Sequence, residues 1–206
     1  MIVDAVNRGA RRVPVWAVYL ALALPAPWLF WLAATGGLGV EPIEALEHEL
    51  GQTALQLLVA GLAVTPLRRF AGVSLLRFRR ALGLACFFYV CLHLAVWLVL
   101  DVQDPARIVA DVLKRPYITV GMVAFVAMIP LALTSNDRAV RRLGARWRRL
   151  HRLTYAAAIL GGMHYVMLAK GFQLEPLLYL GAILILLAVR LQGGSRSPAM
   201  RAGSLR

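Results

Sequence analysis

The chain has 206 residues, of which 60% are hydrophobic, and it carries a formal net charge of +13. Soluble domains are about 45–50% apolar, so this composition excludes an ordinary soluble domain, and the length leaves room for one compact membrane bundle. Such a basic chain could bind nucleic acid, but its arginines form short clusters between apolar runs, which is the pattern of membrane topology and argues against that partner.

Six apolar segments have roughly the length needed to cross ~30 Å of hydrocarbon. In chain order they are residues 15–34, 48–66, 81–100, 117–133, 151–169 and 176–191. Pro25 and Pro27 predict a kink in the first of them. We therefore expect an all-α integral membrane protein, a six-transmembrane-helix bundle over residues 15–191. Residues 1–14 would precede the bundle, and residues 192–206 would form a tail without stable structure.

Basic residues predict the orientation of this bundle. Most of them lie in the N-terminal segment, in the connections after the second and fourth apolar segments, and in the tail. The other three connections hold most of the acidic residues. By the positive-inside rule, both termini are expected in the cytoplasm.

Two histidines lie inside the apolar segments at matching depth. His93 comes 12 residues after the start of the third segment, and His164 comes 13 residues after the start of the fifth. At ~1.5 Å per residue, both lie roughly 18–20 Å from the cytoplasmic boundary. An intramembrane histidine is costly and is commonly kept for a partner, and two at equal depth can ligate one haem iron from opposite faces. For each histidine, a hydrogen bond to a neighbouring helix is the alternative.

His151 starts the fifth segment, about 140° around the helix from His164. A second haem of the same kind would need a histidine near residues 77–81, where there is none, so we expect no such haem. For His151, an interfacial position beside arginines and a cofactor role, including that of alternative iron ligand, both stay open. Gly161 and Gly162 leave room for a flat group against the helix, although ordinary helix packing also explains them.

Arginine clusters mark the predicted cytoplasmic side, and topology with attraction to anionic membrane lipid explains most of them. A sharper hypothesis is a site for a phosphorylated flavin, because guanidinium forks bind phosphate bidentately and a tryptophan offers a face for stacking. The residues of this hypothesis, near His151, are Arg77, Arg79, Arg80, Trp147 and Arg148. Neither a G-x-G-x-x-G motif nor a P-loop occurs, so the reducing equivalents would come from another protein.

Several stretches resemble one known family, in order and over nearly the whole chain. They include GGLG (36–39), RRALGL (79–84), LHL (92–94), RPYITVG (115–121), WRRLHRLTY (147–155) and ILGGMHY (159–165). They are similar to the MsrQ (YedZ) family of haem-binding membrane subunits, within the ferric-reductase-like transmembrane family. The resemblance implies a b-type haem, FMN on the cytoplasmic side and a bacterial inner-membrane location. The family's histidines correspond to His93, His151 and His164, and depth favours His93 with His164.

The resemblance also implies a function. The chain would transfer electrons from a cytoplasmic flavin reductase or reduced flavin to MsrP, a periplasmic molybdopterin enzyme that reduces methionine sulfoxide in oxidised proteins. It would be the electron-transfer subunit and would contribute no catalytic residue to sulfoxide reduction. One alternative is a stand-alone cytochrome b that reduces ferric iron, superoxide or quinone. Another, from a different class, is a small transporter or assembly protein with structural histidines.

Overall fold

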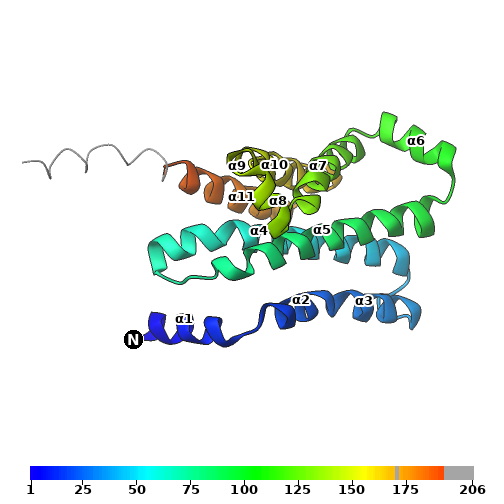
Figure 1. Cartoon of the computed structure of the whole chain (residues 1–206). Coiled ribbons are helices and arrows are strands. Elements are labelled where there is room, and N and C mark those ends of the chain that lie inside the picture. Colours follow the sequence, from blue (N-terminus) through cyan, green and yellow to red (C-terminus); the bar gives the residue numbers. More distant parts are fainter. Residues whose placement is uncertain (170–171, 193–206) are drawn as a thin grey trace, which may run out of the picture.

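The computed structural model describes residues 1–169 and 172–192, and every regular element within them is a helix (Figure 1). Four stretches are long and apolar enough to cross a membrane: Val15–Ala34, Pro42–Ala71, Leu76–Val102 and Pro116–Leu133. The prediction of an all-α protein with several membrane-spanning helices is therefore confirmed.

The first span is divided into two helices at the prolines, where the sequence predicts a kink, although Leu24 between them keeps helical dihedral angles. It consists of α2 (Val15–Ala23) and α3 (Pro25–Ala34), which are separated at Leu24. Pro25 has no N–H with which to continue the hydrogen-bond ladder of α2. The Tyr89 hydroxyl donates to the Leu22 carbonyl at 2.9 Å beside this division. The kink thus forms where α5 (Arg79–Val96), which carries Tyr89, contacts the first span.

The second long helix, α4 (Pro42–Ala71), extends beyond residues 48–66 at both ends. Pro42 stands in its first turn, where a missing N–H costs nothing, and Gly72 ends it with a φ of 70°. Pro66 lies inside the helix and cannot bond the Leu62 carbonyl one turn earlier. Arg190 of α11 (Leu174–Gln192) supplies that bond at 2.6 Å. The helix therefore continues past Pro66, where the predicted segment ends.

The remaining spans follow the predicted segments closely. The third is continuous through η1 (Leu76–Phe78), α5 and a π-helical turn, η2 (Trp97–Val102), and so begins earlier than predicted. Next come α7 (Pro116–Leu133) and α10 (Leu153–Leu168), which lie within one to two residues of the predicted ends. The last, α11, begins two residues earlier and ends one later than predicted.

Four shorter helices lie outside the predicted segments: α1 (Ile2–Arg12), α6 (Pro105–Lys114), α8 (Asp137–Leu143) and α9 (Ala145–Leu150). Their polar sequences give no membrane signal, but two of them have side-chain caps. Asp104 accepts a bond from the Ala106 N–H, and Asn136 accepts one from the Ala139 N–H. The connections after the third and fourth spans therefore contain helices, and α1 precedes the first span.

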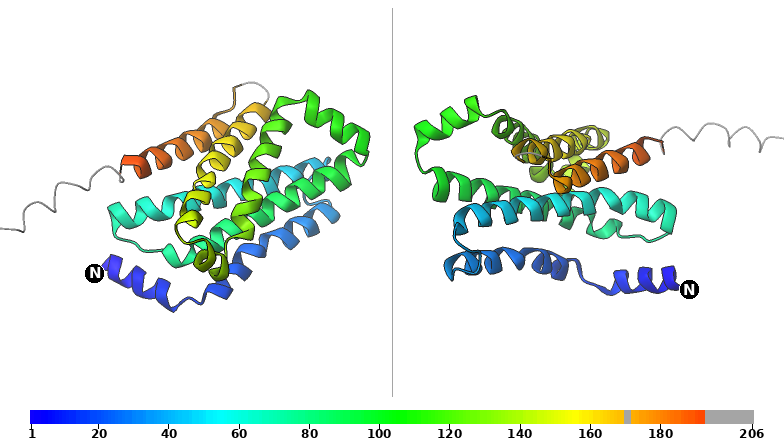
Figure 2. Two further views of the ribbon diagram at one scale, coloured as in Figure 1. Left: turned by 45° about the horizontal axis from the view of Figure 1, so that its top comes forward. Right: turned by 180° about the vertical axis from the view of Figure 1, so that it is seen from behind.

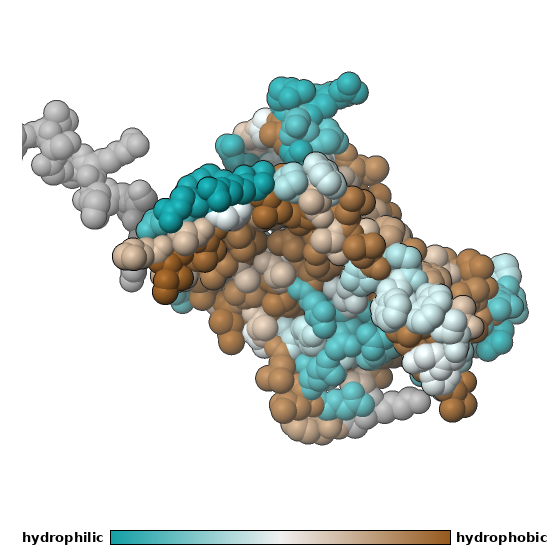
Figure 3. Space-filling model, turned by 90° about the horizontal axis from the view of Figure 1, so that it is seen from below, coloured by the Kyte–Doolittle hydropathy of each residue, from teal (hydrophilic) through white to brown (hydrophobic). Residues whose placement is uncertain are grey.

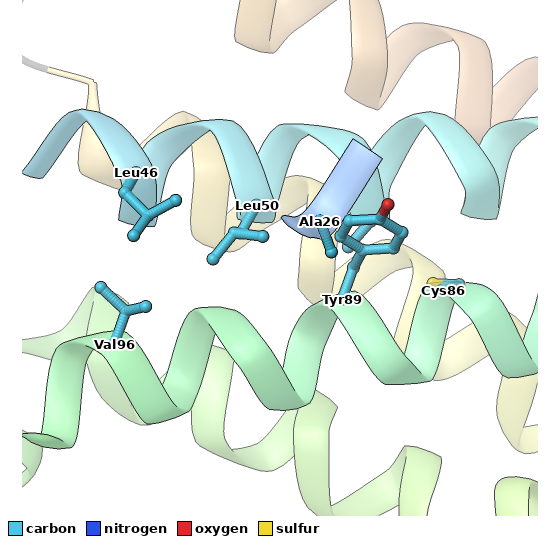
Figure 4. Packing of buried hydrophobic residues seen from close by; sticks show 7 residues of the cluster. Ala26, Leu46, Leu50, Cys86, Tyr89 and Val96 are labelled. Atoms are coloured by element: carbon cyan, nitrogen blue, oxygen red, sulfur yellow. The ribbon is translucent and has the colours of Figure 1, made fainter. Parts of the chain in front are cut away.

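Two helix pairs, α4 with α5 and α7 with α10, form the centre of the bundle (Figure 2). Between α4 and α5, Leu46, Leu50, Tyr89 and Val96 are buried, and Ala26 of α3 closes this cluster (Figure 4). A second cluster joins α4 to α10 and α11. Apolar residues cover much of the outer face in Figure 3. Helices that are apolar on their outer faces as well as in their interior contacts are suited to a lipid environment.

Candidate functional site

His93 of α5 and His164 of α10 lie together between the two helix pairs. Their ring centroids are 6.3 Å apart, and the ring planes stand at 77° to each other. Equal depth on two helices predicted that these side chains could meet, and the structure brings them together. Their role as iron ligands stays a prediction.

Both imidazoles are held by the same kind of hydrogen bond. Nδ1 of His93 lies 2.9 Å from the Glu47 carbonyl oxygen, and Nδ1 of His164 lies 2.7 Å from that of Tyr117. A carbonyl oxygen only accepts, so Nδ1–H must be the donor in each pair. A neutral imidazole protonated on Nδ1 has its lone pair on Nε2. Both rings are therefore in the tautomer that a metal requires, with the backbone partner that ligating histidines commonly have.

A glycine lies under each imidazole, one helical turn after the carbonyl that the ring binds. A Cβ added to Gly51 of α4 would stand 3.2 Å from Nδ1 of His93. A Cβ added to Gly121 of α7 would stand 2.8 Å from Nδ1 of His164. Only glycine lets the ring edge approach the helix closely enough to reach its carbonyl. Each histidine is thus positioned in the same way, by a backbone carbonyl and a glycine four residues later on the neighbouring helix.

The imidazoles line a cavity of about 660 Å³ between α4, α5, α7 and α10. Part of the wall is aliphatic or aromatic, including Leu55, Val90 and Phe125. Charged side chains also line it: Glu44, Glu47, Asp101, Arg107, Asp111 and Arg115. This size and lining are typical of cofactor sites, which are commonly about 300–1,000 Å³. Within the described residues, no group of three or more His, Cys, Asp or Glu side chains could hold a metal. Two imidazoles in one cavity instead suit a metal whose other ligands belong to a cofactor.

The neighbours of His164 divide between this cavity and helix packing. Gly161 lines the cavity, and a Cβ there would meet only Leu58, at 4.0 Å. Gly162 is buried, and a Cβ there would stand 3.0 Å from a methyl of Leu180 on α11. Of the glycine pair, the first leaves room beside the histidines and the second allows close helix packing. His48 also lines the cavity, with its ring 5.7 Å from that of Tyr165.

His151 lies outside this cavity, at the turn before α10. Its Nε2 is 3.1 Å from the Thr134 hydroxyl, which itself donates to the Pro130 carbonyl at 2.6 Å. Since that hydroxyl has one hydrogen, His151 must donate through Nε2. Its ring stacks on Trp147 with centroids 3.8 Å apart, and Trp147 Nε1–H donates to the Thr134 carbonyl. His151 is therefore separate from the pair, although its role as an alternative ligand stays a prediction.

The arginines of the flavin hypothesis have different surroundings. Arg77 donates to the carbonyls of Ala10 and Arg11, which ties η1 to α1. Arg80 binds Asp137 at 2.6 Å, and this hydrogen bond lowers the pKa of the Asp137 carboxyl. Arg148 is exposed, and Arg79 lines a second, smaller cavity. The structure thus does not gather these arginines into one group, and their binding of FMN stays a prediction.

Sequence analysis missed the two glycines on the partner helices and the two carbonyls of Glu47 and Tyr117. Backbone acceptors have no sequence signature, and a lone glycine in an apolar helix commonly reflects packing. Gly121 stands in the RPYITVG stretch, but nothing in that stretch indicates which histidine it faces.

Comparison with known proteins gives a family match over the centre of the chain. Residues 49–162 match the family described as "Ferric reductase like transmembrane component". This range contains His93, the two glycines Gly51 and Gly121, and Gly161, and it ends two residues before His164. No solved structure matches the chain significantly.

Curated relatives match over most of their length. One from Agrobacterium fabrum is 48% identical over 178 residues, which are 86% of this chain and 83% of the relative. One from Brucella anthropi is 43% identical over 191 residues, 91% of this chain and 87% of the relative. A third, from Brucella ovis, is 42% identical over the same shares. All three are named "Protein-methionine-sulfoxide reductase heme-binding subunit MsrQ".

Proposed function

Because the chain belongs to the ferric-reductase-like transmembrane family, and within it to the MsrQ haem-binding subunits, we propose that it transfers electrons across a bacterial inner membrane. The acceptor is a periplasmic molybdopterin methionine-sulfoxide reductase, MsrP, and the donor is a cytoplasmic flavin reductase or reduced flavin. The chain is the electron-transfer subunit, so the sulfoxide chemistry belongs to its partner. The observation that carries this proposal is the pair of Nδ1-bonded imidazoles in one cavity.

The donor set fits a b-type haem. His93 and His164, whose ring centroids are 6.3 Å apart, would hold its iron through Nε2, the nitrogen that each hydrogen bond from Nδ1 leaves free. When bound, the haem supplies a one-electron Fe(III)/Fe(II) couple whose potential depends on its axial ligands and surroundings. The chain orients the two imidazoles through the Glu47 and Tyr117 carbonyls and lines part of the site with apolar side chains.

We assign FMN to the cytoplasmic side. Bound there, it supplies the conversion of a two-electron reductant into single electrons. Arg79 and Arg148 are the arginines of this hypothesis that remain open to a phosphate, because Arg77 and Arg80 bind protein groups. Trp147 and His151 form a stacked pair at the same end of the bundle, before α10. A flavin ring could extend this stack.

The membrane topology proposed for the chain has six spans, with residues 1–14 and 192–206 in the cytoplasm. The four long apolar stretches give four of these spans. The other two are α10 and α11, with 16 and 19 residues. At about 1.5 Å per residue they are about 24 and 28 Å long, close to the thickness of the hydrocarbon core. Residues 193–206 lie outside the described residues.

Reconstitution tests the proposed electron transfer. Membrane vesicles that contain the protein, with flavin reductase and NADH on the cytoplasmic side, are expected to support methionine-sulfoxide reduction by MsrP on the other side. His164→Ala is expected to abolish this activity. His48→Ala serves as the control, because it removes another histidine of the same cavity. Ferric-iron reduction without any sulfoxide reduction by the unmodified protein would instead favour a stand-alone ferric reductase.

A further inference from the structure

A second cavity, of about 350 Å³, lies where the ends of three helices meet. It is lined by Arg69 near the end of α4, Arg79 at the start of α5 and Arg190 near the end of α11. Thr65 and Tyr155 add hydroxyl groups. None of the described residues that line this cavity is acidic.

Arg190 is fixed at the cavity by the proline in α4. Pro66 leaves the Leu62 carbonyl without its helical donor, and Arg190 approaches it with Nε at 3.2 Å and Nη2 at 2.6 Å. Nη2 also donates to the Gly61 carbonyl at 3.2 Å. A guanidinium has five N–H donors, more than these two carbonyls use. These bonds hold Arg190 in place. Its positive charge and some of its N–H groups remain available to a ligand in the cavity.

The positive charge of this cavity is not balanced by protein carboxylates. In the described ranges, the arginine ion pairs are Arg80 with Asp137 and Arg115 with Asp111, so none of the three cavity arginines takes part in one. Arg79 lies close enough to Arg190 for their like charges to interact. Three guanidinium groups around one concavity favour an anion that accepts several hydrogen bonds.

We propose that Arg69, Arg79 and Arg190 form a binding site for a phosphate group. Phosphate matches the fork geometry of guanidinium and can accept further bonds from the hydroxyls of Thr65 and Tyr155. A basic pocket between helix ends at a membrane surface is suited to the phosphate of an anionic phospholipid. A soluble phosphate ester, FMN included, offers the same chemistry. The site does not depend on the proposed electron transfer, and Arg79 is the one residue that it shares with the flavin hypothesis.

Lipid retention tests the proposal on the purified full-length protein. Phosphatidylglycerol is titrated into mixed micelles, and the fraction of protein that retains one lipid is measured by native mass spectrometry. Arg69→Gln is expected to lower the apparent affinity at least tenfold. Arg68→Gln is the matched control, since it removes the same charge from the next residue of α4, which does not line the cavity. A change of less than twofold is expected for the control.

Arg190→Lys provides a second variant, because it keeps the charge but loses the bidentate fork, and it is also expected to weaken lipid retention. Competition with inorganic phosphate and with FMN distinguishes the sources of the phosphate group. Displacement of the lipid means that the site also accepts soluble phosphates, whereas retention assigns it to the lipid. The proposal would be overturned if the control bound the lipid as tightly, or as weakly, as the two cavity variants. The three variants to be compared are Arg68→Gln, Arg69→Gln and Arg190→Lys.

Discussion

The substitution Gly121→Ala tests how the structure positions His164. The added Cβ would stand 2.8 Å from Nδ1 and 3.0 Å from Cε1 of the imidazole. Ordinary contact begins at 3.4 Å, so the ring must retreat by about 0.6 Å. A direct retreat would lengthen the bond from Nδ1 to the Tyr117 carbonyl, now 2.7 Å, beyond the usual limit of about 3.2 Å.

Loss of such a positioning bond typically lowers metal affinity about 10–100-fold. We therefore expect Gly121→Ala to weaken haem binding by about 1.4–2.8 kcal/mol. The assay is haem transfer from the purified protein to an apoprotein acceptor, followed by absorbance. Gly51→Ala is expected to have a smaller effect, because its Cβ would stand 3.2 Å from the other imidazole.

Gly83→Ala is the matched control. Gly83 lies in α5 like His93, and a Cβ there meets nothing within 4 Å. It is expected to leave haem binding unchanged and to add helix stability of about 0.5–1 kcal/mol. If Gly121→Ala and Gly83→Ala retained haem equally well, with identical spectra, the role given to the glycine would be wrong.

Three further outcomes are expected. Arg190→Met leaves the Leu62 carbonyl without a donor, because Pro66 has no N–H to replace it, so thermal unfolding in detergent is expected to show a loss of about 1–3 kcal/mol; an unchanged Tm would contradict this. Asp137→Asn is expected to lower Tm by a constant amount at neutral and mildly acidic pH. Arg80 lowers the pKa of the Asp137 carboxyl, so this carboxyl stays ionised in the folded protein below the ordinary pKa of aspartate. The difference in Tm is expected to disappear only as the pH falls from that ordinary pKa through the lowered pKa. A difference already lost at pH 6 would contradict the assignment. Arg79→Gln is expected to lower the FMN content of the purified protein severalfold while Arg77→Gln leaves it unchanged, since the latter arginine binds backbone carbonyls; the reverse order would refute the flavin site as drawn.

The depth of the two histidines could be predicted because the rise of a helix per residue is fixed. Counting from the predicted helix starts was enough to place His93 and His164 at one level, although those starts were wrong by up to five residues. The rotation of α5 and α10 about their axes could not be predicted, since it depends on packing against neighbours. That the rings meet is therefore information from the structure.

Helix ends were predicted less well where tertiary contacts replace local ones. The second predicted segment ends at Pro66, but the helix continues to Ala71, and Arg190 from a distant part of the chain supplies the donor that the proline lacks. The clustered arginines illustrate the same limit. Their distribution along the chain predicts a topology, whereas the partner of each one, such as Asp137 for Arg80, depends on the fold.

Haem content of the histidine variants tests the central claim most directly. Purified His93→Ala and His164→Ala are each expected to lose the absorbance bands of reduced b-type haem, while His48→Ala, from the same cavity, retains them at full occupancy. Free imidazole added to either ligand variant is expected to restore part of the low-spin spectrum. Full haem occupancy with an unchanged spectrum in His93→Ala or His164→Ala would contradict the account.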